Sequence, residues 1–202
     1  MSSSFAIIPA AGRSRRMGTS KLLLPWKDHT VIQQVLETWQ ASRVNQLVVV
    51  VAPHDQQLAD VCRHAGIEPL VAPMRPVEMK ATVCFALDEV RIRFNPQPTD
   101  VWLLAPADIP GLSYETINQL LAAHLRNPSA ILLPTHGGQR SHPALFPWPL
   151  ASEVARLPPG WGVNRMLDRH EVQELPCDAP LATDIDTLDQ YRAQRDNGTD
   201  RS

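Results

Sequence analysis

Short apolar runs alternate with segments of helical periodicity over the first 135 residues, and this alternation constrains the fold more than any other feature of the chain. Four runs have the β-branched and large apolar residues of strands that are covered on both faces: 5–8, 47–51, 101–104 and 130–133. The segments between them place apolar residues at helical spacing: 30–39, 54–65, 77–94 and 113–125. The alternation predicts an α/β fold, with a mainly parallel sheet and helices on both faces.

Length and composition predict one globular domain. The chain has 202 residues, and we expect the domain to cover 1–193, with a disordered polar tail at 194–202. A formal net charge of −2 gives no reason to expect nucleic acid or an acidic membrane as a partner. Apolar runs fall short of the roughly 18 residues of a membrane span, and the first residues lack the pattern of a secretion signal. The three scattered cysteines, Cys62, Cys84 and Cys177, suit free thiols, so we expect a cytoplasmic protein.

A basic, glycine-containing loop from Pro9 to Lys21 follows the first predicted strand. It combines backbone freedom at Gly12 and Gly18 with positive charge, at the strand edge where α/β proteins bind ligands. The loop lacks both the Gly-Lys-Ser/Thr ending of a P-loop and the Gly-x-Gly-x-x-Gly spacing of a dinucleotide fold. The sequence therefore predicts a different kind of polyphosphate-binding loop.

Carboxylates recur at two further points where chemistry is expected. Asp108 follows the buried run 101–104, so it lies at the carboxyl edge of the sheet. Asp184 and Asp186 precede the last predicted helix, where either can serve as a cap or as a metal ligand. The glycine-rich segment 136–143 is interpreted as a binding loop.

The sequence PAAGRSRRMGTSK resembles the signature loop of the nucleotidyltransferases related to molybdenum cofactor cytidylyl- and guanylyltransferases. The match covers the following positions: Ala10, Ala11, Gly12, Ser14, Arg16, Met17, Gly18 and Lys21. LLAPADIP, GQRSHPALF and ATDIDTLDQY resemble later motifs of the same family, in the same order. The resemblance spans about residues 5–192 and implies a Rossmann-like fold of the nucleotide-diphospho-sugar transferase type.

The resemblance implies transfer of a nucleotidyl group from a nucleoside triphosphate to a phosphorylated acceptor, with Mg²⁺ as cofactor and release of pyrophosphate. It assigns catalysis to Arg16, Lys21 and Asp108, and it places the metal on Asp108 with Asp184 or Asp186. The nucleotide would contact a larger set: Pro9, Ala10, Ala11, Gly12, Arg16, Met17, Gly18, Lys21 and Thr82. Arg13 and Arg15 are interpreted as solvated charges.

The resemblance also points to particular substrates. Ala11 favours CTP, because Ala-Ala-Gly loops in the family tend to accompany CTP and Ala-Gly-Gly loops GTP. Molybdopterin is the acceptor that the resemblance favours, and a molybdoenzyme is the protein partner that would follow from it. His142 either contacts this acceptor or braces a turn.

The chain departs from the family pattern at the acceptor side of the expected cleft. Glu78 stands where a glycine is common, Ser141 replaces a glycine, and the segment 160–165 matches only loosely. Two other hypotheses therefore remain open. The enzyme could act on a sugar phosphate or another small phosphate monoester, or the chain could be a non-catalytic, nucleotide-binding accessory protein for cofactor insertion.

Overall fold

A computed structural model describes the protein at residues 2–12, 21–177 and 183–197. The strands are β1 (Ser4–Pro9), β2 (Pro25–Trp26), β3 (His29–Thr30), β4 (Gln46–Val51), β5 (Leu70–Val71), β6 (Val101–Leu104), β7 (Ile131–His136), β8 (Gln139–Arg140), β9 (Ala144–Pro147) and β10 (Val172–Pro176). The α-helices are α1 (Val31–Ala41), α2 (Gln56–His64), α3 (Met79–Phe94), α4 (Tyr114–His124), α5 (Ala151–Val154) and α6 (Leu188–Asn197). Short 3₁₀ helices are η1 (Lys21–Leu23), η2 (Trp148–Leu150) and η3 (Val163–Asp168).

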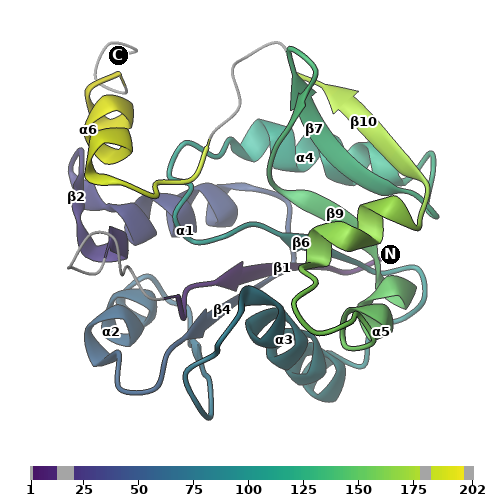
Figure 1. Ribbon diagram of the computed structural model, residues 1–202, viewed down its shortest axis with the longest axis horizontal. Coiled ribbons are helices and arrows are strands. Elements are labelled where there is room, and N and C mark those ends of the chain that lie inside the picture. Colours follow the sequence, from purple (N-terminus) through teal and green to yellow (C-terminus); the bar gives the residue numbers. More distant parts are fainter. Residues whose placement is uncertain (1, 13–20, 178–182, 198–202) are drawn as a thin grey trace.

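One mixed sheet forms the centre of the molecule, with helices on both of its faces (Figure 1). Its strand order is β10-β7-β9-β6-β1-β4-β5, and β8 pairs with β7. β1 runs parallel to β4 and to β6, and β4 runs parallel to β5. The predicted α/β class with a mainly parallel sheet is thereby confirmed.

β1 sends alternate side chains into two apolar clusters, as a strand buried on both faces must. Ala6 and Ile8 pack with residues of α1, α2 and α4, whereas Phe5 and Ile7 pack with residues of α3 and α5. The chain leaves β1 toward β4 and β5 and returns on its other side as β6. The carboxyl ends of β1 and β6 therefore flank the point where the strand order reverses, which is where open α/β sheets bind ligands.

Two predicted helix starts are confirmed by their caps. The Thr30 side chain accepts a hydrogen bond from Gln33 N, and Gln33 completes the capping box of α1. The Ser113 side chain accepts a hydrogen bond from Thr116 N at the start of α4. These caps fix where the helices begin and hence the lengths of the loops that precede them.

The segment 136–143, interpreted from the sequence as a binding loop, contains a short hairpin. β7 continues to His136, turns at Gly137 and Gly138, and pairs with β8, and β9 then runs antiparallel between β6 and β7. Both turn glycines have positive φ, of 57° and 78°, which suits a tight hairpin. The hairpin and β9 place His142 at the edge of the sheet that carries the predicted site.

The last helix packs over the short β2–β3 hairpin (Figure 1). The Tyr191 hydroxyl donates a hydrogen bond to Pro25 O, and its ring centroid lies 6.2 Å from that of Trp26. α6 ends at Asn197, beyond the end near Ala193 that the sequence predicted. Across the described ranges, every helix is too short or too polar to cross a membrane.

Candidate active site

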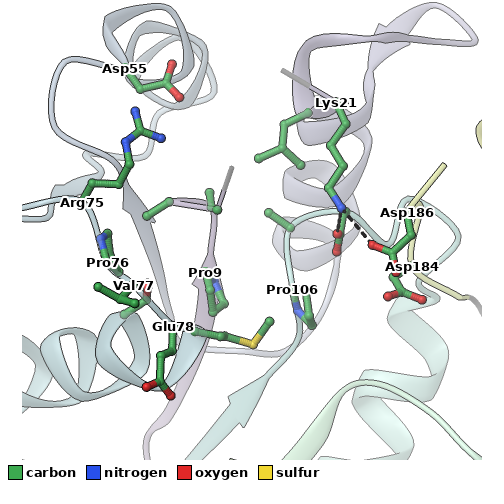
Figure 2. A pocket seen from close by; sticks show the side chains of 18 residues that line it. Pro9, Lys21, Asp55, Arg75, Pro76, Val77, Glu78, Pro106, Asp184 and Asp186 are labelled. Atoms are coloured by element: carbon green, nitrogen blue, oxygen red, sulfur yellow. Dashed lines mark ion pairs between the residues drawn. The ribbon is translucent and has the colours of Figure 1, made fainter. Parts of the chain in front are cut away.

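A cavity of about 610 Å³ opens at the carboxyl ends of β1 and β6 (Figure 2). We call it the main cavity. Figure 2 shows Lys21, Asp184 and Asp186 on one side of it, and Asp55 and Arg75 on the other. Its lining residues are Pro9, Ala10, Ala11, Gly12, Lys21, Leu22, Asp55, Arg75, Pro76, Val77, Glu78, Met79, Thr82, Pro106, Ala107, Asp108, Asp184 and Asp186.

The chain after β1 forms one wall of the main cavity. Ala10 N donates a 2.8 Å hydrogen bond to Val50 O, and the Ala10 and Ala11 side chains are buried in the two apolar clusters. A Cβ added at Gly12 would meet nothing within 4 Å. Packing within the described residues therefore does not require glycine at this position, and a ligand can approach the backbone here. Arg13, Arg15, Arg16, Met17 and Gly18 lie outside the described residues.

Backbone hydrogen bonds hold Asp108 at the centre of the site. Ala107 N donates to Pro9 O over 3.2 Å, and Ile185 N donates to Asp108 O over 3.0 Å. β1, the loop after β6 and the segment before α6 are thereby joined. The Asp108 side chain is 13% exposed, and its Oδ1 is buried with no hydrogen-bond partner among the described residues.

Lys21 connects the same three segments through its side chain. Its ammonium group forms an ion pair with Asp108 Oδ2 and donates a 2.8 Å hydrogen bond to Ile185 O. Asp186 Oδ1 lies 3.5 Å from Lys21 Nζ. Lys21 was predicted as a phosphate ligand, and the structure places its ammonium group against the carboxylates.

The donor set of the main cavity fits a hard divalent cation. Mg²⁺ and Mn²⁺ prefer carboxylate oxygens, and Mg²⁺ is usually held by one or two carboxylates together with phosphate oxygens and water. The partnerless Oδ1 of Asp108 and the carboxylates of Asp184 and Asp186 offer such oxygens. The described residues contain no group of three or more His, Cys, Asp or Glu that could hold a metal by themselves. Water, or the phosphate oxygens of a bound nucleotide, would therefore complete the coordination.

The start of α3 forms the opposite wall. Thr82, which the resemblance assigns to nucleotide contact, is buried in the first turn of α3 and lines the main cavity. Glu78 occupies the N-cap position but makes no side-chain cap hydrogen bond among the described residues. Glu78 also lines the main cavity.

Sequence reasoning missed Asp55 and Arg75, which also line the main cavity. Asp55 is the N-cap of α2, where its side chain accepts a hydrogen bond from Leu58 N, and it follows β4. Arg75 follows β5, and its guanidinium group points toward Asp55 (Figure 2). The sequence predicts a strand before each of them, at 47–51 and at 67–71, so their place at the carboxyl edge of the sheet was the available signal.

A second cavity, of about 360 Å³, adjoins the hairpin between β7 and β8, and we call it the side cavity. Its apolar lining consists of Leu104, Leu133, Ala144, Phe146, Val163 and Leu167, and its polar lining consists of Arg140, Ser141, His142, Asn164, Thr183 and Asp184. Asp184 lines both cavities. A ligand in the side cavity would therefore lie next to a ligand in the main cavity.

His142 is half-buried and lines the side cavity. Its Nδ1 lies 3.3 Å from Leu104 O. Burial lowers the pKa of His142, while Leu104 O and the charges of Asp184 and Asp108 oppose this shift. A neutral imidazole can serve as a hydrogen-bond partner without adding positive charge to the site.

Most of the predicted site residues in the described ranges converge on one place. The main cavity brings together Pro9, Ala10, Ala11, Gly12, Lys21, Thr82, Asp108, Asp184 and Asp186. His142 lies in the adjoining side cavity. Residues far apart in the sequence thus surround a space with two basic side chains, Lys21 and Arg75, several carboxylates and exposed backbone among the described residues. This is the composition expected of a site for a metal–polyphosphate complex.

Residues 6–175 match the profile of the MobA-like NTP transferase domain. The chain belongs to this family. The predicted class of enzyme, a nucleotidyltransferase, is thereby confirmed, and its substrates include a nucleoside triphosphate.

Two curated relatives match nearly all of the chain. It is 25% identical to the molybdenum cofactor cytidylyltransferase of Escherichia coli, over 99% of this chain and 100% of that protein. It is 27% identical to the nicotine blue oxidoreductase of Paenarthrobacter nicotinovorans, over 92% of this chain and 94% of that protein. The two curated relatives are therefore named for different activities.

Solved structures of Rv0371c from Mycobacterium tuberculosis are similar to this fold. One is 27% identical with a TM-score of 0.79, and the alignment covers 96% of this chain and 99% of that one. A complex of Rv0371c with manganese is 26% identical with a TM-score of 0.78, over the same shares of the two chains. A protein with this fold has thus been solved with a divalent cation.

Proposed function

We propose that the protein transfers a cytidylyl group from CTP to the phosphate of molybdopterin, with Mg²⁺ as cofactor, and releases pyrophosphate. The observation that carries the proposal is the convergence of the Gly12 backbone, Lys21 and Asp108 on one cavity. The E. coli relative that matches the whole chain is named for this reaction. The expected setting is the cytoplasm, and a molybdoenzyme would receive the product.

The main cavity supports nucleotidyl transfer through positioning and charge. Backbone N–H groups near Gly12 would hold the β- and γ-phosphates, and the Lys21 ammonium would neutralise their charge. Asp108, with Asp184 or Asp186, would hold Mg²⁺, which neutralises charge on the phosphate oxygens when it is bound. Asp184 also borders the side cavity, where the acceptor phosphate would have to approach the α-phosphorus in line with pyrophosphate.

The lining of the side cavity supports an acceptor with a flat, fused ring system rather than a sugar phosphate. Apolar side chains, including Leu133, Phe146 and Leu167, form much of its wall. Apolar walls suit a flat, fused ring, whereas a sugar would leave many hydroxyl groups without partners. His142, Asn164 and Arg140 line the same cavity and would contact polar edges of such a ring or its phosphate.

The carboxylates of the main cavity also help to choose between nucleotidyl transfer and the oxidation for which the second curated relative is named. At 25% and 27% identity, the two curated relatives do not decide between transfer and oxidation. A lysine and several carboxylates around an open backbone suit a metal–polyphosphate substrate. The composition of the main cavity therefore supports transfer.

Purified protein, Mg²⁺, each of the four nucleoside triphosphates and a panel of acceptors test the proposal. The panel contains molybdopterin and several sugar phosphates, and the measurement is pyrophosphate release with mass detection of the nucleotide-linked product. We expect turnover with CTP and molybdopterin, and loss of turnover in Asp108→Asn. Asp88→Asn, on the exposed face of α3, is the matched control.

Other outcomes would reject the proposal. Turnover confined to sugar phosphates would show that a sugar phosphate, and not molybdopterin, is the acceptor. Calorimetric binding of CTP with no turnover over the whole panel would favour the accessory role.

A further inference from the structure

Lys21 occupies the position where a cation is expected to bind. Its ammonium group contacts Asp108 Oδ2, the carbonyl oxygen of Ile185 at 2.8 Å and the carboxylate of Asp186 at 3.5 Å. The side chains of Lys21 and Asp108 are only 18% and 13% exposed. The group is therefore a positive charge held by oxygens in a partly desolvated place, where charge interactions are stronger than in water.

The proposed roles of Lys21 and Asp108 conflict in this arrangement. A divalent cation on Asp108 and an ammonium group on the same carboxylate repel each other at close range. The ammonium group has three N–H donors. Asp108 and Ile185 O take two of them, and Asp186 Oδ1 lies 3.5 Å away, so phosphates would compete with these contacts for the ammonium group. Nucleotide binding and metal binding each favour movement of Lys21 away from the carboxylates.

We propose that Lys21 is the internal counter-cation of the carboxylate site and that nucleotide draws it away, so that nucleotide and divalent cation bind cooperatively. The inference rests on the proposed function in taking Asp108 as a metal ligand and the main cavity as the nucleotide site. It adds a second role for Lys21, which opposes metal binding until a polyphosphate arrives. By linkage, a cation on Asp108 also raises the affinity for nucleotide, because both ligands favour the same displaced position of Lys21.

The main chain around the site does not depend on this lysine. Ile185 N donates to Asp108 O over 3.0 Å, and the Ile185 side chain is fully buried in the apolar cluster beneath α1 and α4. The segment 184–186 therefore remains attached to the loop after β6 when Lys21 is replaced. Lys21→Met, which keeps the length and apolar part of the side chain, removes the charge with little change to this scaffold.

Mn²⁺ binding without nucleotide tests the inference, with the free ion measured by electron paramagnetic resonance. The comparison uses the full chain as wild type, Lys21→Met and Lys27→Met. Lys27 is exposed in the turn between β2 and β3, so its replacement makes the same change in net charge away from the carboxylates. We expect Lys21→Met to bind Mn²⁺ about tenfold more tightly than wild type, in the usual range of coupling between sites. We expect Lys27→Met to match wild type.

Several results would overturn the inference. Unchanged or weaker Mn²⁺ binding in Lys21→Met would show that Lys21 does not oppose the metal and instead helps to orient Asp108. An equal gain in Mn²⁺ affinity in Lys27→Met would show that the effect comes from the change in net charge and not from the position of Lys21. Absence of saturable Mn²⁺ binding in both wild type and Lys21→Met would remove the metal from this site.

A measurement on the wild-type chain avoids dependence on a variant that folds poorly. The chain has three lysines, Lys21, Lys27 and Lys80, so selective ¹³C labelling of lysine gives a spectrum with three side-chain signals. We expect the Lys21 signal to shift on titration with Mg²⁺ and, separately, with CTP in the presence of EDTA, while the Lys27 signal stays constant. A Lys21 signal that stays constant through both titrations would contradict the proposal.

These measurements are separable from catalysis. Neither uses turnover, so a chain that releases no pyrophosphate can still show displacement of Lys21. Conversely, a chain that transfers CMP with uncoupled metal and nucleotide binding would support the proposed function and reject this inference.

Discussion

Replacement of Asp108 by alanine separates catalysis from stability. Asp108 Oδ2 pairs with Lys21, while Asp108 Oδ1 is buried with no hydrogen-bond partner among the described residues. A buried oxygen without a hydrogen-bond partner destabilises the folded state, whereas a partly buried ion pair stabilises it. The two effects of Asp108→Ala on stability therefore have opposite signs.

The structure gives the rough size of each effect. Removal of the partnerless oxygen should relieve about 1–3 kcal/mol. Loss of the ion pair should cost about 1–2 kcal/mol, between the values for exposed and fully buried pairs, because Lys21 is 18% exposed and keeps its contacts with Ile185 O and Asp186. We expect the free energy of unfolding to change by less than about 1.5 kcal/mol, and the melting temperature by less than about 5 °C.

Activity should respond far more strongly. Loss of one preorganised group that stabilises transition-state charge typically costs about 2.7–4 kcal/mol, or a hundredfold to a thousandfold in kcat. The assays are pyrophosphate release under saturating CTP and calorimetric melting of the same samples. Asp88→Ala, at an exposed position that pairs with Arg91, should leave both readings unchanged.

Two results would refute this reasoning about Asp108. An unfolding free energy that falls by more than about 3 kcal/mol, with activity lost in proportion to folded protein, would make Asp108 a structural residue. Unchanged kcat would remove it from the metal site.

Five further substitutions give four distinct predictions. Gly12→Ala should fold normally, since its Cβ meets nothing within 4 Å, yet weaken CTP binding at least tenfold by calorimetry, because a methyl group would then face the phosphates. His142→Ala should raise KM for the acceptor and leave KM for CTP unchanged in steady-state kinetics; equal changes in both would place His142 outside the acceptor site. We expect one of the variants Asp184→Asn and Asp186→Asn to lose more Mn²⁺ affinity than the other, and that variant identifies the second metal ligand. If both variants bind Mn²⁺ as tightly as wild type, neither residue is a metal ligand. Burial lowers the pKa of His124 from its ordinary 6.5, so below that pH the unfolded chain binds a proton that the folded chain does not. Stability should therefore fall as the pH drops below about 6.5, and His124→Leu should flatten this dependence in denaturant titrations; a variant with the wild-type slope would contradict the assignment.

The parallel part of the fold was predictable because its signals are local. The runs at β1, β4 and β6 are apolar throughout, and Thr30 and Ser113 mark helix starts by side-chain chemistry that acts within one turn. β9 was missed because it has only four residues, Ala144–Pro147, and it follows Pro143 and ends at Pro147, and prolines are typical of loops and turns. The β2–β3 hairpin was missed because Lys27 adopts a positive φ of 51°, which lysine seldom does.

The candidate site was predictable to the extent that strand ends mark it. Gly12 and Asp108 follow β1 and β6, so the parallel sheet brings them to one edge. Asp55 and Arg75 also follow strands, but the paths of their loops decide that they face the main cavity. The contact of Lys21 with Asp108 depends on tertiary placement of a long side chain, which spacing along the chain does not specify.

Crystals soaked with Mn²⁺ and a non-hydrolysable CTP analogue would test the central claim most directly. Anomalous scattering locates the manganese independently of the rest of the electron density. The account predicts an anomalous peak within bonding distance of Asp108 and of Asp184 or Asp186, with the triphosphate against the backbone of Gly12 in the main cavity. An analogue bound elsewhere, or manganese bound without Asp108, would contradict it.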